Sequence, residues 1–353
     1  STLDRSSAAS DVYKRQIDTR TIGYFLTHVV DNFSDKKPSR RQFLAGAAAL
    51  GAGSSAAGSL SASRDDQLIT EVQEWAQITG DGVDATPYGL PIEFEKDVVR
   101  RNVSWLTADT ISSINFSPIH ALDGTITPQG CAFERHHSGA IELRKEDYRL
   151  MINGLVDQEL VFTYEDLERF PREQHVYFCE CAANTGMEWA GAQLNGVQFT
   201  HGMIHNMEYI GVPLRTLLNE AGLNAAGDLK EKWIFVEGAD ASSNGRSIPL
   251  EKALDDVLVA FKANGEALRK EHGYPVRLVV PGWEGNMWVK WLRRVEVMDK
   301  PVESREETSK YTDTLADGIS RKWTWAMDAK SVVTSPSPQS PISHGKGPLV
   351  ISF

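Results

Sequence analysis

HVYFCECAANTGMEW, residues 175–189, is the stretch that most strongly constrains the fold of this chain. Apolar and aromatic residues fill its first half, which predicts a β-strand that runs into a loop of small residues. Because side chains alternate along a strand, Cys179 and Cys181 share one face until the chain turns at Ala182. A thiolate at the end of a strand suits a transition metal or a redox cofactor. The alternative is two buried thiols that pack as small hydrophobic groups.

Length, charge and cysteine content limit the classes of protein to consider. With 353 residues, the chain is long enough for two domains of ordinary size. Its formal net charge of −11 argues against a nucleic-acid partner, because phosphate binding needs a basic face. The cysteines Cys131, Cys179 and Cys181 are too few for a disulfide framework, and their odd number leaves at least one free thiol.

The first residues are expected to contribute nothing to the fold. The string SSAASDVYKRQ, residues 6–16, looks like a translated library adapter, so we treat residues 1–16 as an artefact. An ordinary N-terminal tail is the alternative, and natural sequence is expected to begin near Ile17.

Residues 17–63 carry the pattern of an export leader. SRRQFL, residues 39–44, precedes a stretch rich in Ala and Gly, which is typical of the twin-arginine route. That stretch is too short and too interrupted for a stable transmembrane helix. We therefore expect a periplasmic protein without membrane insertion, cleaved near residues 61–63. A basic turn before a linker is the alternative.

The remainder predicts a central α+β domain with flanking segments. Residues 64–122 predict an N-terminal wrap with short helices at 68–75 and 108–113. The central domain covers 123–300, and 301–353 hold a linker and the start of a further domain, with the boundary between Lys300 and Tyr311. Helices are predicted at 163–170, 213–221 and 249–256, and strands at 148–156, 233–237, 257–263, 276–280, 289–297 and 322–327. These helices and strands lack the regular βαβ alternation of a doubly wound sheet.

Local signals mark several of these boundaries. Thr163 is a predicted N-cap, and Pro171 ends that helix. Pro213 lies in the first turn of the next helix, with Gly222 just past its end. The pair Asn264-Gly265 predicts a tight turn after the strand at 257–263.

Two segments gather cations in loops. FERHH, residues 133–137, places Arg135, His136 and His137 together, and three cations repel one another unless an anion or a carboxylate lies between them. HGYPVR, residues 272–277, presents His272 and Arg277. The alternative for FERHH is a solvated basic patch paired with neighbouring glutamates.

Two more segments offer binding groups. In GADASSNGRSIPL, residues 238–250, Asp240 and Arg246 flank a predicted helix N-terminus, whose free N–H groups suit a phosphate. PGWEGNMWVKWLRR, residues 281–294, places Lys290 among tryptophans. A core edge with an extended lysine is the alternative there.

Taken in this order, the segments resemble the sulfite oxidase family of molybdopterin enzymes from about Gly89 to Asp299. FERHH is similar to the family's F-x-R-x-H loop and ECAAN to its C-A-x-N metal-ligand loop, while HGYPVR, VVPG and VKWLRR are similar to its pterin-binding elements. HGMIHNMEYIGVPL, RSIPLEKALDD and REETSKYTD resemble its sulfane dehydrogenase branch most. The resemblance implies an α+β molybdopterin-binding domain, followed by an immunoglobulin-like β-sandwich dimerisation domain that is truncated here.

The resemblance also implies roles for individual residues. Cys181 would be the protein ligand of molybdenum in a Mo-molybdopterin cofactor, Cys179 would be structural, and Arg135 would favour an anionic substrate. The implied cofactor-binding residues are Phe133, Arg135, His136, His137, Cys181, Asp240, His272, Arg277, Trp288, Val289 and Lys290.

The implied activity is oxidation of a sulfur compound by transfer of an oxygen atom from a molybdenum–oxo group. The chain has no C-x-x-C-H haem site, so the expected electron acceptor is a c-type cytochrome subunit. A sulfur carrier protein is the expected partner, and the full-length protein is expected to be a homodimer or heterotetramer. Nucleic acid is not an expected partner.

Two departures from the family pattern favour sulfane on a carrier protein over free sulfite. Thr185 and Gly186 stand where sulfite oxidases usually carry arginines. Phe261 replaces a usual tyrosine, which would remove a hydroxyl from the metal pocket and leave proton handling to water or another residue.

Rival interpretations remain open on the sequence alone. Within the same fold, they are a sulfite dehydrogenase and a sulfoxide reductase. Outside it, they are a cofactor-free periplasmic binding or scaffold protein, and a zinc site from His175, Cys179 and Cys181, which strand alternation disfavours.

Overall fold

The structure, a computed structural model, describes residues 90–102, 113–189, 191, 195–223, 231–242, 244–338, 341–342 and 351. All of them belong to one unit of the chain, Pro87–Phe353. The predicted adapter, leader and helix at 68–75 lie outside the described residues, as does the helix at 108–113 apart from Ser113. Among the described helices, none combines the length and apolar character needed to cross a membrane.

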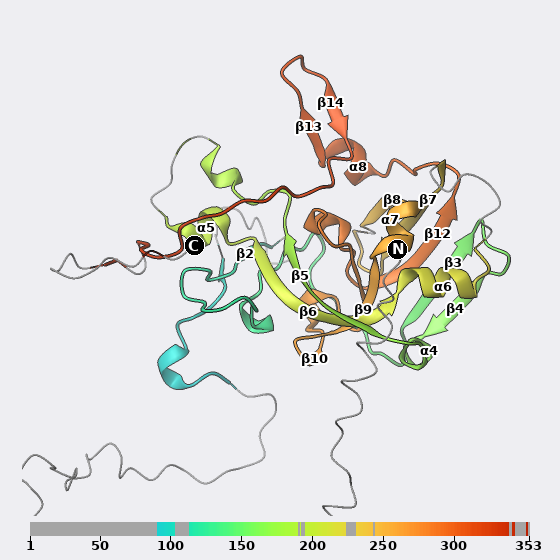
Figure 1. The fold of residues 1–353 in the computed structure, drawn as a ribbon, viewed down its shortest axis with the longest axis horizontal. Helices are drawn as coiled ribbons and strands as arrows, with labels where there is room; N and C mark the ends of the chain where they lie inside the picture. Colours follow the sequence, from blue (N-terminus) through green and yellow to red (C-terminus); the bar gives the residue numbers. More distant parts are fainter. Residues whose placement is uncertain are drawn as a thin grey trace, which may run out of the picture. The chain divides into compact units, whose positions relative to one another are not determined.

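One five-stranded sheet has the strand order β4-β3-β12-β7-β8 (Figure 1). Strands β3 and β12 run parallel, and the other neighbours are antiparallel. In β3, the fully buried Leu150 and Ile152 alternate with exposed residues, so one face of the sheet covers the core. Its strands are β3 (Arg149–Gly154), β4 (Leu160–Thr163), β7 (Trp233–Gly238), β8 (Gly245–Pro249) and β12 (Leu292–Met298).

The second sheet is antiparallel and carries the cysteine stretch. Its order is β10-β9-β6-β5, and β11 also pairs with β9. The turn after β9 is formed by Asn264 and Gly265, whose φ angles of 50° and 77° suit the predicted Asn-Gly hairpin. Its strands are β5 (Glu173–Glu180), β6 (Ile204–Pro213), β9 (Leu258–Ala263), β10 (Glu266–Ala267) and β11 (Arg277–Val279).

The helices predicted at 163–170, 213–221 and 249–256 are confirmed. Helix α4 (Tyr164–Arg169) begins with a capping box between Thr163 and Asp166, in which each side chain bonds the other's backbone N–H. Helices α6 (Leu214–Glu220) and α7 (Leu250–Asp255) follow prolines. The remaining short elements are β1 (Arg101–Asn102), β2 (Asn115–Phe116), α5 (Val197–His201), η2 (Glu93–Glu95), η3 (Gln129–Cys131), η4 (Gly186–Glu188), η6 (Lys270–His272) and η7 (Gly285–Met287). The fold class is α+β, as predicted.

Three local predictions were wrong. Strand β8 occupies part of the stretch 238–250, so Arg246 lies on a strand and not at a helix N-terminus. The strand predicted at 289–297 begins only at Leu292, because Trp291 has a φ of 51°, outside the β region. The strand predicted at 322–327 ends at Lys322, because Trp323 has a φ of 63°.

The segment after β12 packs against β8 and against the loop that carries Trp283. Helix α8 (Arg305–Ser309) leads into the hairpin of β13 (Thr312–Thr314) and β14 (Ser320–Lys322). Glu307, which is 3% exposed, accepts hydrogen bonds from the backbone N–H and the hydroxyl of Ser247 on β8. Trp325 stacks on Trp283 with ring centroids 4.5 Å apart. The immunoglobulin-like domain and the boundary after residue 300 stay predictions.

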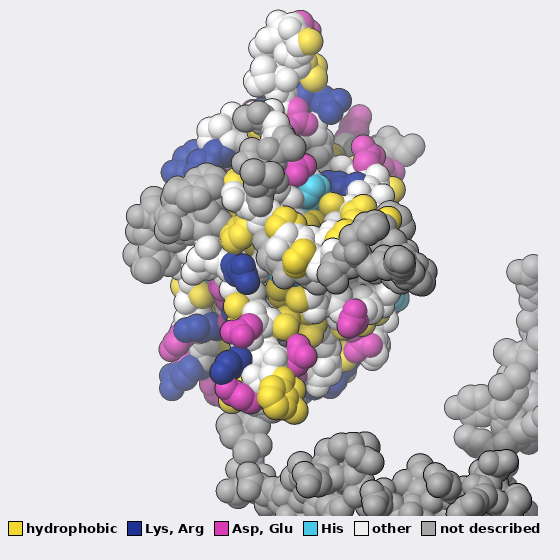
Figure 2. Space-filling view, turned by 90° about the vertical axis from the view of Figure 1, so that its left-hand side faces the viewer, with side chains coloured by type: hydrophobic (Ala, Val, Ile, Leu, Met, Phe, Trp, Pro, Cys, Tyr) yellow, Lys and Arg dark blue, Asp and Glu magenta, His cyan; other side chains and the backbone are white. Residues whose placement is uncertain are grey.

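Charges of both signs share the surface. On the face in Figure 2, basic and acidic side chains are interspersed around an apolar area. The expectation that no nucleic acid binds stays a prediction. On β5, Val176 and Phe178 are 50% and 38% exposed, so the outer part of this strand faces solvent and only its end enters the interior.

Candidate active site

A cavity opens where the end of β5, the loop 133–137, and the turns η6 and η7 meet. The space between its walls amounts to about 750 Å³, part of which is open solvent at the mouth. Ten of the eleven residues predicted to bind the cofactor line it, and Val289 does not. The described lining is Phe133, Glu134, Arg135, His136, His137, Cys179, Cys181, His205, Asp240, Ser242, Asn244, Glu271, His272, Arg277, Gly285, Asn286, Trp288, Lys290, Trp291 and Tyr311.

Cys181 lies directly after β5, where its backbone N–H still bonds to the carbonyl of Met203 at 3.0 Å. The residue is partly exposed, and its side chain lines the cavity. Burial of the thiol raises the pKa of Cys181, and the backbone N–H of Ala183 and the guanidinium of Arg135 oppose that shift. The thiol is therefore protonated near neutral pH unless a metal ion displaces its proton.

Cys179 also lines the cavity but is almost fully buried, and its structural role stays a prediction. It is 3% exposed, and burial raises its pKa to about 12. A side chain at Gly285 would come within 3.2 Å of its sulfur and 2.9 Å of the carbonyl oxygen of Glu180, so only glycine allows this loop to approach. His175 lies on the solvent-facing part of β5 and bonds Glu173 at 3.0 Å. Among the described residues, no three His, Cys, Asp or Glu side chains are grouped so that they could hold a metal ion, so the zinc alternative has no support from the structure.

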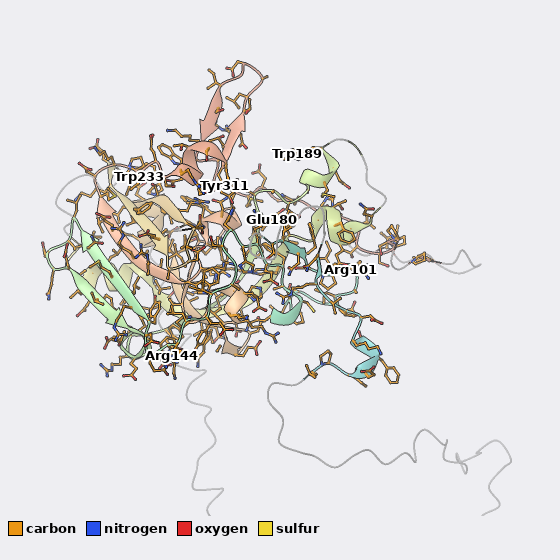
Figure 3. The ribbon with its side chains drawn as sticks, turned by 180° about the vertical axis from the view of Figure 1, so that it is seen from behind. Arg101, Arg144, Glu180, Trp189, Trp233 and Tyr311 are labelled. Carbon is orange, nitrogen blue, oxygen red and sulfur yellow. The ribbon has the colours of Figure 1, made fainter. Side chains whose placement is uncertain are left out.

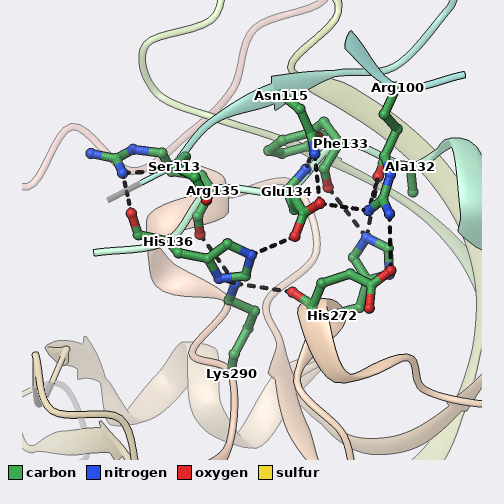
Figure 4. Close-up of polar contacts among 11 residues, drawn as sticks. Arg100, Ser113, Asn115, Ala132, Phe133, Glu134, Arg135, His136, His272 and Lys290 are labelled. Atoms are coloured by element: carbon green, nitrogen blue, oxygen red, sulfur yellow. Dashed lines mark hydrogen bonds and ion pairs between the residues drawn. The ribbon is translucent and has the colours of Figure 1, made fainter. Parts of the chain in front are cut away.

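The loop 133–137 avoids the repulsion expected of three cations because His136 is neutral. Burial lowers its pKa, although the hydrogen bond to Glu134 partly opposes this. Its Nδ1 accepts from the ammonium of Lys290 at 2.9 Å, so its Nε2 donates to Glu134 at 2.6 Å (Figure 4). Burial alone would raise the pKa of Glu134, but the bond from His136 and the charge of Arg100 lower it to about 2.

His137 and Tyr311 form a second neutral pair in the cavity wall. The Nε2 atom of His137 lies 3.3 Å from the hydroxyl of Tyr311. Burial and the nearby Arg135 lower the pKa of His137 to about 4. The Arg246 guanidinium lies 4.5 Å from the ring centroid of Tyr311 and fixes it from the other side. Sequence reasoning missed Tyr311, which lies in the quoted string REETSKYTD but carries no local signal of cavity exposure.

Phe261 does not lie at the cavity. It is fully buried, and its ring packs against Tyr164 with centroids 6.0 Å apart. The expectation that its missing hydroxyl alters the metal pocket was therefore wrong, because β9 turns this side chain into the core. Tyr311 supplies a hydroxyl to the cavity instead. Thr185 and Gly186 also lie outside the lining, where Thr185 bonds the carbonyl of Thr200.

The remaining predicted residues hold the floor and walls. Asp240 is 7% exposed and accepts a bond from Ser242. Trp288 donates its indole N–H to the carbonyl of Trp283 at 3.0 Å. Val289 is 1% exposed and belongs to the core, because strand-like alternation points it away from Trp288 and Lys290. Sequence reasoning also missed His205, Asn244 and Asn286.

Two cations in the cavity wall, the buried Arg277 and the half-buried Lys290, have no carboxylate partner among the described residues. Arg277, 3% exposed, donates to the carbonyls of His272 and Trp288, each at 3.2 Å. Lys290 donates to the carbonyls of Arg135 and Glu271 and to His136. Burial and the charge of Arg277 lower the pKa of Lys290 to about 7. Buried positive charge of this kind is unfavourable until an anion binds.

The stability of the cofactor-free protein should therefore rise with pH above 7. An unfolded lysine keeps its proton up to about pH 10.4, whereas folded Lys290 loses it near pH 7. The unfolded state then binds more protons, so the free energy of unfolding increases by up to about 1.4 kcal/mol per pH unit.

Urea unfolding at pH 7, 8 and 9 measures this slope. Lys290→Met should remove it. Lys270→Met is the matched control, because that ammonium is 56% exposed and paired with Glu142. Equal slopes in wild type and Lys290→Met would contradict the assigned pKa.

Comparison with known proteins identifies the family. A family model described as "Oxidoreductase molybdopterin binding domain" matches residues 137–306. The solved structure of the sulfane dehydrogenase SoxCD from Paracoccus pantotrophus is 72% identical, with a TM-score of 0.76, over 81% of this chain and 72% of that chain. The chain belongs to the sulfite oxidase family.

Other members of the sulfite oxidase family are more distant. Mouse mitochondrial sulfite oxidase is 34% identical over 58% of this chain and 38% of its own length. An NADH nitrate reductase from Phaseolus vulgaris is 30% identical over 61% of this chain and 27% of its own length. The chain thus spans less than half the length of these relatives, and they differ in substrate.

The cavity residues fit the molybdopterin cofactor of this family. Cys181 offers the soft thiolate that a transition metal prefers. Arg277, which is buried, and Lys290, which is half-buried, offer positive charge for a phosphate. His272, in the cavity lining, has a buried Nδ1 atom without a hydrogen-bond partner in the described structure. Unpaired buried polar atoms cost stability, which a bound polar group restores.

Proposed function

We propose that the protein oxidises sulfur compounds by oxygen-atom transfer at a molybdenum cofactor, with sulfane sulfur on a carrier protein as substrate. The observation that carries this proposal is the Cys181 thiol, which faces a cavity lined by Arg135, His272, Arg277 and Lys290. Its support from comparison is the 72% identity to a sulfane dehydrogenase.

The chain's own residues then have separable tasks. When bound, the cofactor supplies the oxygen-atom transfer and takes up two electrons. Cys181 holds the metal, while Arg277 and Lys290 neutralise the cofactor's phosphate. Arg135, near Cys181, orients an anionic sulfur group by charge. The neutral pair His137 and Tyr311 can accept and donate a hydrogen bond to a water in the same cavity.

The charge around Cys181 bears on the choice of substrate. Thr185 and Gly186 lie outside the described lining, and Arg135 is the lining arginine whose charge acts on the pKa of Cys181. A sulfur held on a protein carrier carries less charge than free sulfite and needs less neutralisation. Sulfite is the second candidate, because the mouse relative is a sulfite oxidase.

Further parts of the proposal rest on the sequence and on the similar solved structure. We propose export to the periplasm by the twin-arginine route and electron transfer to a c-type cytochrome subunit. A homodimer or heterotetramer is the proposed full-length assembly. The 72% identical structure is that of the SoxCD complex, which supports a partner subunit for this chain.

Metal analysis and two substrate assays test the proposal. The purified protein should contain about one molybdenum per chain and reduce a c-type cytochrome when given carrier-bound sulfane. Faster turnover of free sulfite would favour the sulfite dehydrogenase instead. Protein that folds, contains no molybdenum and takes up none would support a cofactor-free binding protein.

A further inference from the structure

Two buried histidines meet at the floor of the cavity. His205 on β6 and His272 on η6 are 3% and 2% exposed, and their rings meet edge to face with centroids 5.8 Å apart. Both line the cavity, and in both the Nδ1 atom has no hydrogen-bond partner in the described structure. Such orphaned atoms are rare in buried side chains and call for a ligand.

The tautomer of His272 follows from its neighbours. Its Nε2 lies 3.3 Å from the carbonyl oxygens of both Ala132 and Phe133 (Figure 4). Carbonyl oxygens only accept, so Nε2 carries the hydrogen. Burial lowers the pKa of His272 well below its usual value, so the ring is neutral and its Nδ1 is a bare acceptor.

His205 has the opposite pattern. Its Nε2 lies 2.9 Å from the hydroxyl of Tyr209. The Tyr209 hydroxyl has no other hydrogen-bond partner in the described structure, and a buried O–H without an acceptor is costly, so the hydroxyl donates to Nε2 and the hydrogen of the ring lies on Nδ1. Burial keeps this ring neutral as well, because it lowers the pKa of His205 well below its usual value. The cavity floor therefore offers one donor and one acceptor side by side.

We propose that His205 and His272 together bind the heterocyclic edge of the cofactor, with His205 donating to a carbonyl or ring nitrogen and His272 accepting from a ring N–H. A pterin presents such adjacent groups, whereas a phosphate has no N–H for His272. The assignment rests on the proposed function for the identity of the cofactor. It makes His205 a cofactor-binding residue, in addition to its packing against Phe133 at 5.0 Å.

Cofactor retention tests this assignment without an activity assay. The loaded wild-type protein and His205→Phe are incubated at elevated temperature, and released pterin is measured by fluorescence after oxidation. Loss of one buried hydrogen bond should speed release about tenfold, equivalent to about 1.4 kcal/mol. His175→Phe is the matched control, because that histidine is 44% exposed on β5. It should release pterin at the wild-type rate.

The cofactor-free proteins separate binding from folding. His205→Phe alone would leave the buried Tyr209 hydroxyl without its partner, so the double variant His205→Phe/Tyr209→Phe is used, which removes the orphaned nitrogen together with that hydroxyl. Its thermal midpoint without cofactor should stay close to that of wild type. Faster release together with a lowered midpoint of the double variant would assign His205 a purely structural role and overturn the proposal. If His205→Phe does not fold, Tyr209→Phe serves instead. Tyr209→Phe removes the hydroxyl that fixes the hydrogen of His205 on Nδ1, so it should speed release of pterin about threefold.

The outcomes also distinguish this assignment from the proposed function. Equal retention of pterin by wild type and His205→Phe overturns the assignment alone. Absence of pterin from a folded wild-type protein that takes up none overturns both.

Discussion

Serine in place of Cys181 is expected to reduce turnover by more than about 100-fold. Replacing a residue that only hydrogen-bonds to a metal ligand typically has a smaller effect, roughly 10–100-fold. A hydroxyl has a much higher pKa than a thiol and is a poor ligand for a metal held by sulfur. Molybdenum per chain should fall in parallel. The fold should persist, because the turn at Cys181 is held by backbone bonds to Met203 and Asn184.

Cys131→Ser is the control for loss of a thiol. Cys131 is partly exposed and does not line the cavity. Its variant should keep both molybdenum and turnover. Wild-type turnover in Cys181→Ser would remove the metal-ligand assignment and with it the proposed chemistry.

Methionine in place of Lys330 is expected to destabilise the protein by about 2 kcal/mol, because it leaves the buried carboxylate of Glu180 without its cationic partner. Lys330 lies beyond α8 in sequence, and its ammonium bonds Glu180 at 2.7 Å. The Glu180 side chain is 2% exposed, whereas that of Lys330 is 42% exposed. Breaking a fully buried pair costs roughly 3–5 kcal/mol, and solvent near Lys330 lowers that figure.

The pair of Glu180 and Lys330 also positions the turn that carries Cys181, the proposed metal ligand. Glu180, which is labelled in Figure 3, directly precedes Cys181. Its carboxylate also accepts a hydrogen bond from the side-chain amide of Asn184 at 2.9 Å. Asn184 in turn accepts from the backbone N–H of Met203. Lys330→Met should therefore loosen the turn and speed loss of molybdenum on dialysis.

A double-mutant cycle isolates the interaction. Glu180→Gln removes the charge that Lys330 neutralises, so the double variant Glu180→Gln/Lys330→Met should regain most of the stability lost in Lys330→Met. Lys322→Met is the matched control, because Lys322 and Glu303 form a more exposed pair at 2.9 Å. It should cost less than about 1 kcal/mol in urea unfolding. Equal losses in Lys330→Met and Lys322→Met would show that Glu180 needs no cationic partner.

Short-range signals predicted much of the fold. The Thr163 capping box, the Asn264-Gly265 turn and the strand that leads to Cys181 each depend on residues close in sequence, and each is present in the structure. Failures arose where one residue left the β region. Trp291 and Trp323 have positive φ angles that no apolar pattern signals, so two predicted strands were misplaced.

The amino-acid pattern alone was enough to identify the cysteine strand, the α+β class and ten of the twenty described residues that line the cavity, because motifs carry local geometry and residue chemistry together. Folding in three dimensions was needed to bring Tyr311, His205 and Lys330 to the site and to turn Phe261 and Val289 away. These placements depend on packing between segments that are far apart in the chain. That packing decides which way each side chain points and which charged groups lie near it. Residue order by itself contains no such distances.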